Sequence, residues 1–226
     1  MLFRSFAVAA STAFQMIRDK MKSDQLIKEK ENEKIKTELS FLRSQVSPHF
    51  MFNVLNNMVA LARKKSDVLE PSLIKLSSLM RYMLYEADEE KVPLEKETEY
   101  LQSYIDLQEQ RFGKNVTLNF SSQTPDDNYY IEPMLLIPFV ENAFKHGTGL
   151  IEDAIITIDL RAKNKMLQFS VRNKYNPESL EIKDKTSGIG MANVKRRLNL
   201  LYGGNHSLLI TKNNGWFMVS LQLNFH

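Results

Sequence analysis

The sequence contains no cysteine among its 226 residues, which excludes disulfide bonds and thiolate zinc sites. Charge of neither sign dominates, because 30 basic side chains face 27 acidic ones and the formal net charge is +3. This balance does not indicate a binder of polyanions, so we expect no direct contact with nucleic acid. With 43% hydrophobic residues, the chain can build one large or two small globular units with buried cores.

Long apolar runs are also missing. Polar residues such as Ser11 and Thr12 interrupt the apolar stretch 5–17, whereas a membrane-spanning helix needs about 20 apolar residues. An ordinary amphipathic helix explains this stretch, and so does the end of a membrane helix whose first part precedes this sequence. The lysines and arginines between residues 18 and 30 are typical of a cytoplasmic flank. We therefore expect a signalling helix at residues 1–34, next to the cytoplasmic (inner) membrane, with this portion in the cytoplasm.

Glycine and proline do not occur in residues 15–46, which are rich in Lys, Glu, Gln and Leu and should be helical. Apolar side chains at coiled-coil spacing predict a dimer: Ile35, Leu39, Leu42 and Val46.

Pro48 directly precedes His49, late in this predicted helix. Proline within a helix removes a hydrogen bond and costs about 3 kcal/mol, which suggests that the geometry at His49 matters. The pattern alone leaves two interpretations open. His49 is either a polar residue that sets the register of the seam, or a functional histidine that a kink at Pro48 redirects.

A helical hairpin is expected next. The first helix should continue to about residue 64, and Asp67 should cap a second helix that ends near residue 87. Two hairpins from two chains would form a four-helix bundle. The charged linker 88–94 contains a proline and marks the expected boundary between a dimerisation unit, residues 35–90, and a second domain, residues 91–226.

The second domain has an α+β pattern. Helices are predicted near residues 95–111, 133–146 and 191–201, and strands near residues 116–120, 154–161, 166–172, 207–212 and 216–223. The turns at residues 163–165 and 213–215 predict antiparallel pairs.

Polar groups share one side of the helix at residues 135–147. Asn142 and His146 are one turn apart, as are Glu141 and Lys145. A solvated helix face with an ion pair explains this pattern, and composition alone favours that explanation. A nucleotide site explains it too, because an amide oxygen suits Mg²⁺, a lysine can neutralise phosphate, and an imidazole can stack on a base.

Several common catalytic motifs are absent: the P-loop, the H-E-x-x-H zinc motif and the G-x-S-x-G nucleophile elbow. Gly188 and Gly190 do occur at the start of a predicted helix, where backbone N–H groups and the helix dipole can hold an anion. A flexible loop before a basic, solvated helix face explains the same residues.

Three ordered stretches match the motifs of a known family. They are residues 45–53 (QVSPHFMFN), residues 137–147 (IPFVENAFKHG) and residues 188–203 (GIGMANVKRRLNLLYG). In that order they resemble the phosphoacceptor box, the N box and the second glycine box of LytS/YehU-type sensor histidine kinases. The resemblance covers roughly residues 35–225. It implies a helical-hairpin dimerisation bundle with an N-terminal coiled coil, followed by an α/β-sandwich ATP-binding domain of the Bergerat (GHKL) type.

The resemblance also implies a function. His49 would be autophosphorylated from ATP with Mg²⁺, and the phosphoryl group would pass to an aspartate of a response regulator, of the LytTR type. Catalytic roles fall on His49, Glu141 and Asn142, with Asn142 also the Mg²⁺ ligand. Nucleotide-binding roles fall on Asn142, Lys145 (phosphates), His146 (stacking on adenine), Asn173, Gly188 and Gly190.

One family motif is missing from the chain. Where most histidine kinases have D-x-G-x-G, this sequence has Asn173-Lys174-Tyr175-Asn176-Pro177. The Asn173 amide can still accept a hydrogen bond from the adenine amine, although it is weaker than a carboxylate by about 1 kcal/mol. Ser47 also replaces the usual Asn. Two alternative functions follow: a non-catalytic dimeric scaffold with a degenerate nucleotide domain, and an ATPase of the same superfamily, which the hairpin bearing His49 disfavours.

Overall fold

The computed structural model describes residues 48–87, 89–124, 129–149, 151–176 and 189–225, with scattered positions between residues 16 and 39. The chain divides into two compact units, residues 1–44 and 45–226. The described positions of the first unit are helical, as predicted. Of the predicted seam, Leu42 and Val46 lie outside the described residues, as does the apolar stretch at 5–15. In the described part of the chain, no helix has the length and hydrophobicity needed to cross a membrane.

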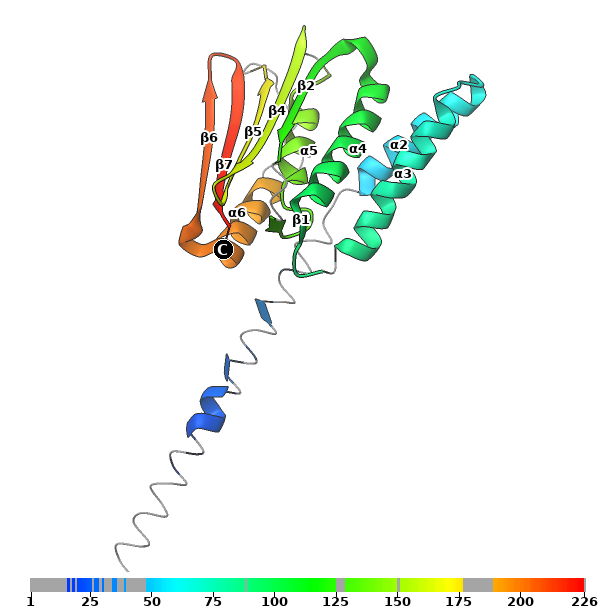
Figure 1. Cartoon of the computed structure of the whole chain (residues 1–226). Helices are drawn as coiled ribbons and strands as arrows, with labels where there is room; N and C mark the ends of the chain where they lie inside the picture. The colour runs from blue at the N-terminus through cyan, green and yellow to red at the C-terminus, as the bar shows by residue number, and fades with distance from the viewer. Residues whose placement is uncertain are drawn as a thin grey trace, which may run out of the picture. The chain divides into compact units, whose positions relative to one another are not determined.

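The second unit begins with the predicted helical hairpin (Figure 1). Helix α2 (Pro48–Arg63) packs on α3 (Leu69–Arg81), and α3 continues into a π-helical turn, η1 (Tyr82–Glu86). The predicted Asp67 cap is wrong. Val68 occupies the N-cap position without a side-chain cap, and the Ser66 hydroxyl accepts the Val68 N–H at 3.4 Å. The tight turn brings Ser66 rather than Asp67 within reach of that donor.

A five-stranded mixed sheet forms the core of the rest of the unit, in the order β2-β4-β5-β7-β6. Its strands are β2 (Val116–Gln123), β4 (Ala154–Lys163), β5 (Met166–Lys174), β6 (His206–Asn213) and β7 (Trp216–Asn224). The predicted antiparallel pairs β4–β5 and β6–β7 are confirmed. Their turns contain Asn164, Lys165, Asn214 and Gly215 at positive φ, as tight hairpin turns require. The parallel pairing of β2 with β4 was not part of the sequence prediction.

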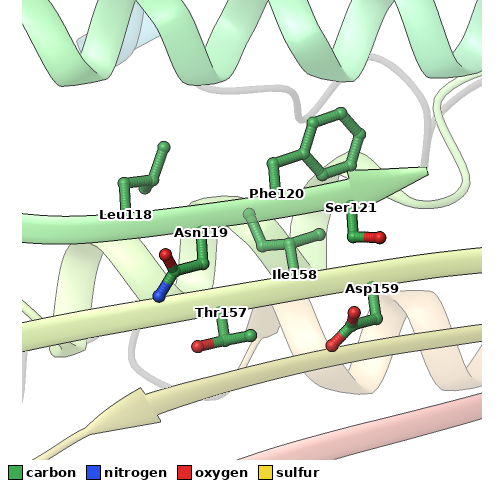
Figure 2. Close-up of a pocket in the computed structure, with 7 residues that line it drawn as sticks. All are labelled: Leu118, Asn119, Phe120, Ser121, Thr157, Ile158 and Asp159. Carbon is green, nitrogen blue, oxygen red and sulfur yellow. The ribbon is translucent and has the colours of Figure 1, made fainter.

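Three helices cover one face of this sheet (Figure 1): α4 (Leu94–Phe112), α5 (Ile137–His146) and α6 (Ile189–Tyr202). Alternate strand residues such as Ile156, Ile158 and Phe169 are buried beneath them. The opposite face of the sheet is mostly polar, although Leu209 and Met218 are exposed on it. A depression there, between β2 and β4, exposes Asn119, Thr157 and Asp159 (Figure 2). The α+β class and the order of hairpin followed by α/β sandwich are therefore confirmed.

The hairpin packs directly on the sandwich in this structure. Helix α3 contacts α4, the Lys75 ammonium pairs with the Asp106 carboxylate, and Lys96 of α4 pairs with Glu86 of η1 at 2.5 Å. The predicted linker contains β1 (Val92–Pro93), which forms a short antiparallel pair with β3 (Tyr130–Ile131).

Candidate functional site

Helix α5 carries most of the predicted site residues. Val140, Ala143 and Phe144 point into the core, whereas Asn142 and His146 are partly exposed and Lys145 is exposed. The helix begins at Ile137 and not at residue 133 as predicted, because residues 133–136 form a turn. The side of α5 with Asn142, Lys145 and His146 is thus accessible to a ligand.

The end of α5 is packed tightly against the end of β5. Gly147 donates its N–H to the Ala143 carbonyl at 2.7 Å and is buried. A Cβ on Gly147 would lie 2.5 Å from the Ala143 oxygen and 2.7 Å from Cβ of Asn173. Such distances are well below van der Waals contact, so only glycine fits. This contact brings Asn173 next to the N-box helix, although the two are far apart in sequence.

Asn173 carries an unpaired acceptor. Its side chain is fully buried, and Nδ2 donates to the Lys174 carbonyl at 2.9 Å. Its Oδ1 is shielded from solvent and has no hydrogen-bond partner in the described part of the structure. A buried polar atom without a partner costs about 1–3 kcal/mol. A ligand that donates an N–H at this point would remove that cost, and an adenine amine has the required chemistry.

The phosphate side is described only in part. Gly190 lies in the first turn of α6, is exposed, and has open space where a Cβ would be. Gly188 lies outside the described residues, as does the whole segment 177–188. In the described ranges there is no group of three or more His, Cys, Asp and Glu side chains that could hold a metal ion. An amide oxygen such as that of Asn142 is of the hard type that suits Mg²⁺.

The backbone of His49 lies in α2, and its side chain is outside what the structure describes. The next residue, Phe50, is buried, and its ring centroid lies 4.4 Å from that of Tyr104 in α4. Tyr104 in turn meets Phe144 of α5 edge to face at 6.0 Å. A chain of aromatic rings therefore joins the start of the hairpin to the N-box helix.

Glu141 differs from its neighbours on α5 because burial raises the pKa of its carboxyl to about 7. Its Oε1 atom is shielded from solvent and lacks a hydrogen-bond partner among the described residues. Burial, and then the charge of Glu141, raise the pKa values of Tyr100 and Tyr104 of α4. Glu141 thus faces α4, and it does not share the open side of Asn142 and Lys145.

Sequence reasoning missed Glu97, which is fully buried in α4. Its carboxylate accepts the N–H groups of Met134, at 2.9 Å, and Leu136, at 3.1 Å, and the Tyr82 hydroxyl also donates to it. Burial raises the pKa of this carboxyl, and the bond from Tyr82 opposes that shift most. These bonds hold residues 134–136 as a turn and explain the late start of α5.

Arg197 is the buried member of a basic run in α6, Lys195-Arg196-Arg197. Its side chain is 2% exposed, and its guanidinium donates to the carbonyls of Met134, at 2.9 Å, and Pro133, at 3.0 Å. Nothing in the run Lys195-Arg196-Arg197 distinguishes the buried cation from the exposed ones. On the same helix, the apolar side chains of Val194 and Leu198 are buried as well.

Two family models match this chain: Histidine kinase over residues 37–116 and GHKL domain over residues 134–224. Over these two regions the chain is similar to histidine kinases. The first match spans the hairpin and α4, and the second spans α5, α6 and most of the sheet. The resemblance to LytS-type sensor kinases is therefore confirmed.

Curated relatives agree with this assignment. The chain is 30% identical to sensor histidine kinase YpdA of Escherichia coli over 74% of its own length and 31% of the relative. It is 31% identical to sensor protein LytS of Staphylococcus haemolyticus over 76% of its own length and 31% of the relative. The chain thus spans about a third of the length of these relatives.

Solved structures of histidine kinases are similar as well. The catalytic domain of histidine kinase ThkA aligns with 59% of this chain and 93% of its own, at 16% identity and a TM-score of 0.44. The kinase domain of the blue-light activated histidine kinase EL346 of Erythrobacter litoralis aligns with 84% of this chain and 95% of its own, at 15% identity and a TM-score of 0.45.

Proposed function

We propose that this chain is the kinase portion of a two-component sensor that phosphorylates His49 from Mg²⁺·ATP and passes the phosphoryl group to a response-regulator aspartate. The observation that carries the proposal is the unpaired Oδ1 of Asn173, which is buried behind Gly147 at the end of the N-box helix. It supplies the acceptor that an adenine amine needs. The missing family aspartate therefore weakens nucleotide binding without abolishing it.

The protein would catalyse phosphoryl transfer mostly by positioning the reactants and neutralising charge. Bound ATP would supply the phosphoryl group, and Mg²⁺ would neutralise the charge on its oxygens. The Asn142 amide oxygen would hold the cation, the Lys145 ammonium would bind the phosphates, and the His146 ring would stack on adenine. The neutral imidazole of His49, whose ordinary pKa is about 6.5, is a competent nucleophile at neutral pH. Glu141, which faces the α4 tyrosines, fits a structural role better than proton transfer at the nucleotide.

A second copy of this chain is the proposed partner of the hairpin. Apolar side chains on α2 remain exposed, and so do others around a pocket on α3 and η1: Phe52, Leu55, Val59, Leu73, Met80 and Leu84. Contiguous apolar surface of this kind marks an interface, and two such hairpins form a four-helix bundle. With the coiled coil of residues 15–46, it would make a homodimer.

The remaining assignments concern the whole protein, of which this chain has the kinase part. We propose attachment to the cytoplasmic membrane through segments that precede residue 18, with a LytTR-type response regulator as the recipient. The basic residues from Arg18 to Lys30 support a cytoplasmic flank, because they would follow a membrane helix directly.

Labelling with γ-³²P ATP tests the proposal. The wild-type chain should acquire an acid-labile, alkali-stable phosphoryl group, and His49→Gln should abolish labelling while leaving Mg²⁺·ATP binding unchanged. His206→Gln, the same exchange on β6, is the matched control and should label normally. Labelling that persists in His49→Gln would refute the phosphoacceptor assignment. A flat titration of the wild type with Mg²⁺·ATP would instead favour the non-catalytic scaffold.

A further inference from the structure

The hairpin and the N-box helix meet at the carboxylate of Glu97. The Tyr82 hydroxyl donates to it from η1, the turn that ends the hairpin. The N–H groups of Met134 and Leu136 donate to it from the segment that leads into α5. One buried anion therefore has partners in two elements that lie more than forty residues apart in sequence.

The segment 133–136 is held from two sides by opposite charges. Glu97 accepts its N–H groups, and Arg197 of α6 donates to its carbonyls. Met134 sits at a φ of +57°, in the left-handed region that a non-glycine residue seldom adopts. Strained conformations of this kind persist only where the surroundings over-determine them. The geometry of this segment, and hence the start of α5, therefore depends on Glu97 and Arg197.

The position of the Tyr82 hydroxyl depends on the position of the hairpin. Its ring is buried and stacks on Tyr100 of α4, with centroids 4.6 Å apart. It is the first residue of the π-helical turn, an irregularity frequent at functional sites. A shift or rotation of α3 would move the hydroxyl away from Glu97 and leave a buried carboxylate oxygen with one donor fewer.

We propose that Tyr82 and Glu97 are positioning residues that couple the helical hairpin to nucleotide binding. Their hydrogen bond keeps the Glu97 carboxylate in place, the carboxylate holds the segment 133–136, and that segment sets the position of α5 with Asn142 and Lys145. The inference rests on the proposed function of α5. Because coupling between two sites is reciprocal, bound nucleotide must in turn stabilise the end of the hairpin.

Tyr82→Phe tests this coupling in the full chain, because it removes the hydroxyl and keeps the stacked ring. Tyr85→Phe is a matched control, since Tyr85 belongs to the same turn but is 73% exposed. Amide hydrogen exchange is measured with and without Mg²⁺·ADP, and the affinity for Mg²⁺·ADP is measured by calorimetry. Loss of a hydrogen bond to a charged group commonly changes an equilibrium constant about tenfold. Only part of this loss should reach the segment 133–136.

We expect Tyr82→Phe to raise exchange in residues 131–137 and to weaken Mg²⁺·ADP binding, each at least about threefold. Mg²⁺·ADP should protect residues 78–87 in the wild type and in Tyr85→Phe, but not in Tyr82→Phe. A purely structural tyrosine would lower stability and leave both the affinity and this protection intact, which would overturn the proposal. If even the wild type fails to bind Mg²⁺·ADP, the proposed function fails. In that case, amide exchange in residues 131–137 alone tests whether the hairpin is coupled to this segment. If Tyr82→Phe leaves that exchange unchanged, the coupling is overturned.

Discussion

Replacing Gly147 with alanine gives the sharpest test of the candidate adenine site. The added Cβ would lie 2.5 Å from the Ala143 carbonyl oxygen, 2.7 Å from Cβ of Asn173 and 2.9 Å from Nδ2 of Asn173. A flexible side chain cannot move aside to remove these overlaps, because the first contact is with a backbone oxygen and the second with a Cβ atom. The end of α5 and the end of β5 must therefore separate.

Inserting one methyl group into packing this tight costs about 1–3 kcal/mol, and we expect a value near the upper end. Urea unfolding followed by far-UV circular dichroism measures this loss. The same separation moves Asn173, so Mg²⁺·ATP affinity measured on the folded variant should fall by about tenfold, as expected if one hydrogen bond of about 1.4 kcal/mol is lost.

Gly204→Ala is the control, because a Cβ at Gly204 would meet nothing within 4 Å. That variant should be neutral or slightly more stable, by up to about 1 kcal/mol, through a less flexible unfolded chain. Wild-type stability together with wild-type affinity in Gly147→Ala would refute the close packing of α5 on β5. A loss of stability with no change in affinity would separate Gly147 from the nucleotide site.

Two further predictions concern single carboxyl and amide groups. Asn173→Asp should tighten Mg²⁺·ATP binding by about fivefold to tenfold, since a charged acceptor is stronger, and should make the free protein less stable, because a buried carboxylate lacks a partner. Calorimetry measures the affinity and urea unfolding measures the stability, with Asn119→Asp on the open face as the control. Weaker binding by Asn173→Asp would contradict the acceptor role of Oδ1. For Glu141, burial raises the pKa of the carboxyl from its ordinary value of 4.5 to about 7. Between these pH values the folded state binds a proton that the unfolded state releases, so stability falls as pH rises through that window. In urea unfolding, Glu141→Gln should therefore be more stable than the wild type at pH 8, by about 1–3 kcal/mol, and equal to it near pH 4. The control Glu152→Gln, at an exposed position, should show no such trend. A gain in stability that is larger at pH 4 than at pH 8 would contradict a raised pKa for Glu141.

Much of the fold could be predicted from the sequence, because its strands alternate and its helices are amphipathic. All five strands of the main sheet lie within a few residues of their predicted positions. The parallel pair β2–β4 was missed, since local patterns predict hairpins but say nothing about strands joined through an intervening helix. Asp67 failed as a cap because the helix begins one residue later, with Val68 at the N-cap position and no side-chain cap, an outcome that depends on turn geometry and not on residue preference.

The candidate site could be predicted where residues act through their own chemistry, and not where they act through tertiary partners. Asn142, Lys145 and His146 stand on the exposed side of one helix, which periodicity predicts. Glu97 and Arg197 look like the ordinary charged surface of helices, and only the structure places them in the core. Gly147 was part of a matched motif, but its contact with Asn173 depends on how α5 and β5 approach each other.

The buried charges around residues 133–136 explain why the hairpin and the nucleotide domain need not act independently. An isolated carboxylate in the core would be costly, and removing one partner of a buried charge is strongly destabilising. Glu97 meets this requirement with donors from η1 and from the start of α5, and Arg197 adds an opposite charge from α6. Any motion that withdraws one element leaves the carboxylate short of a donor, so the other elements must adjust. Under the proposed coupling, a signal that displaces the hairpin would therefore reach Asn142 and Lys145 through the hydrogen bonds of Glu97.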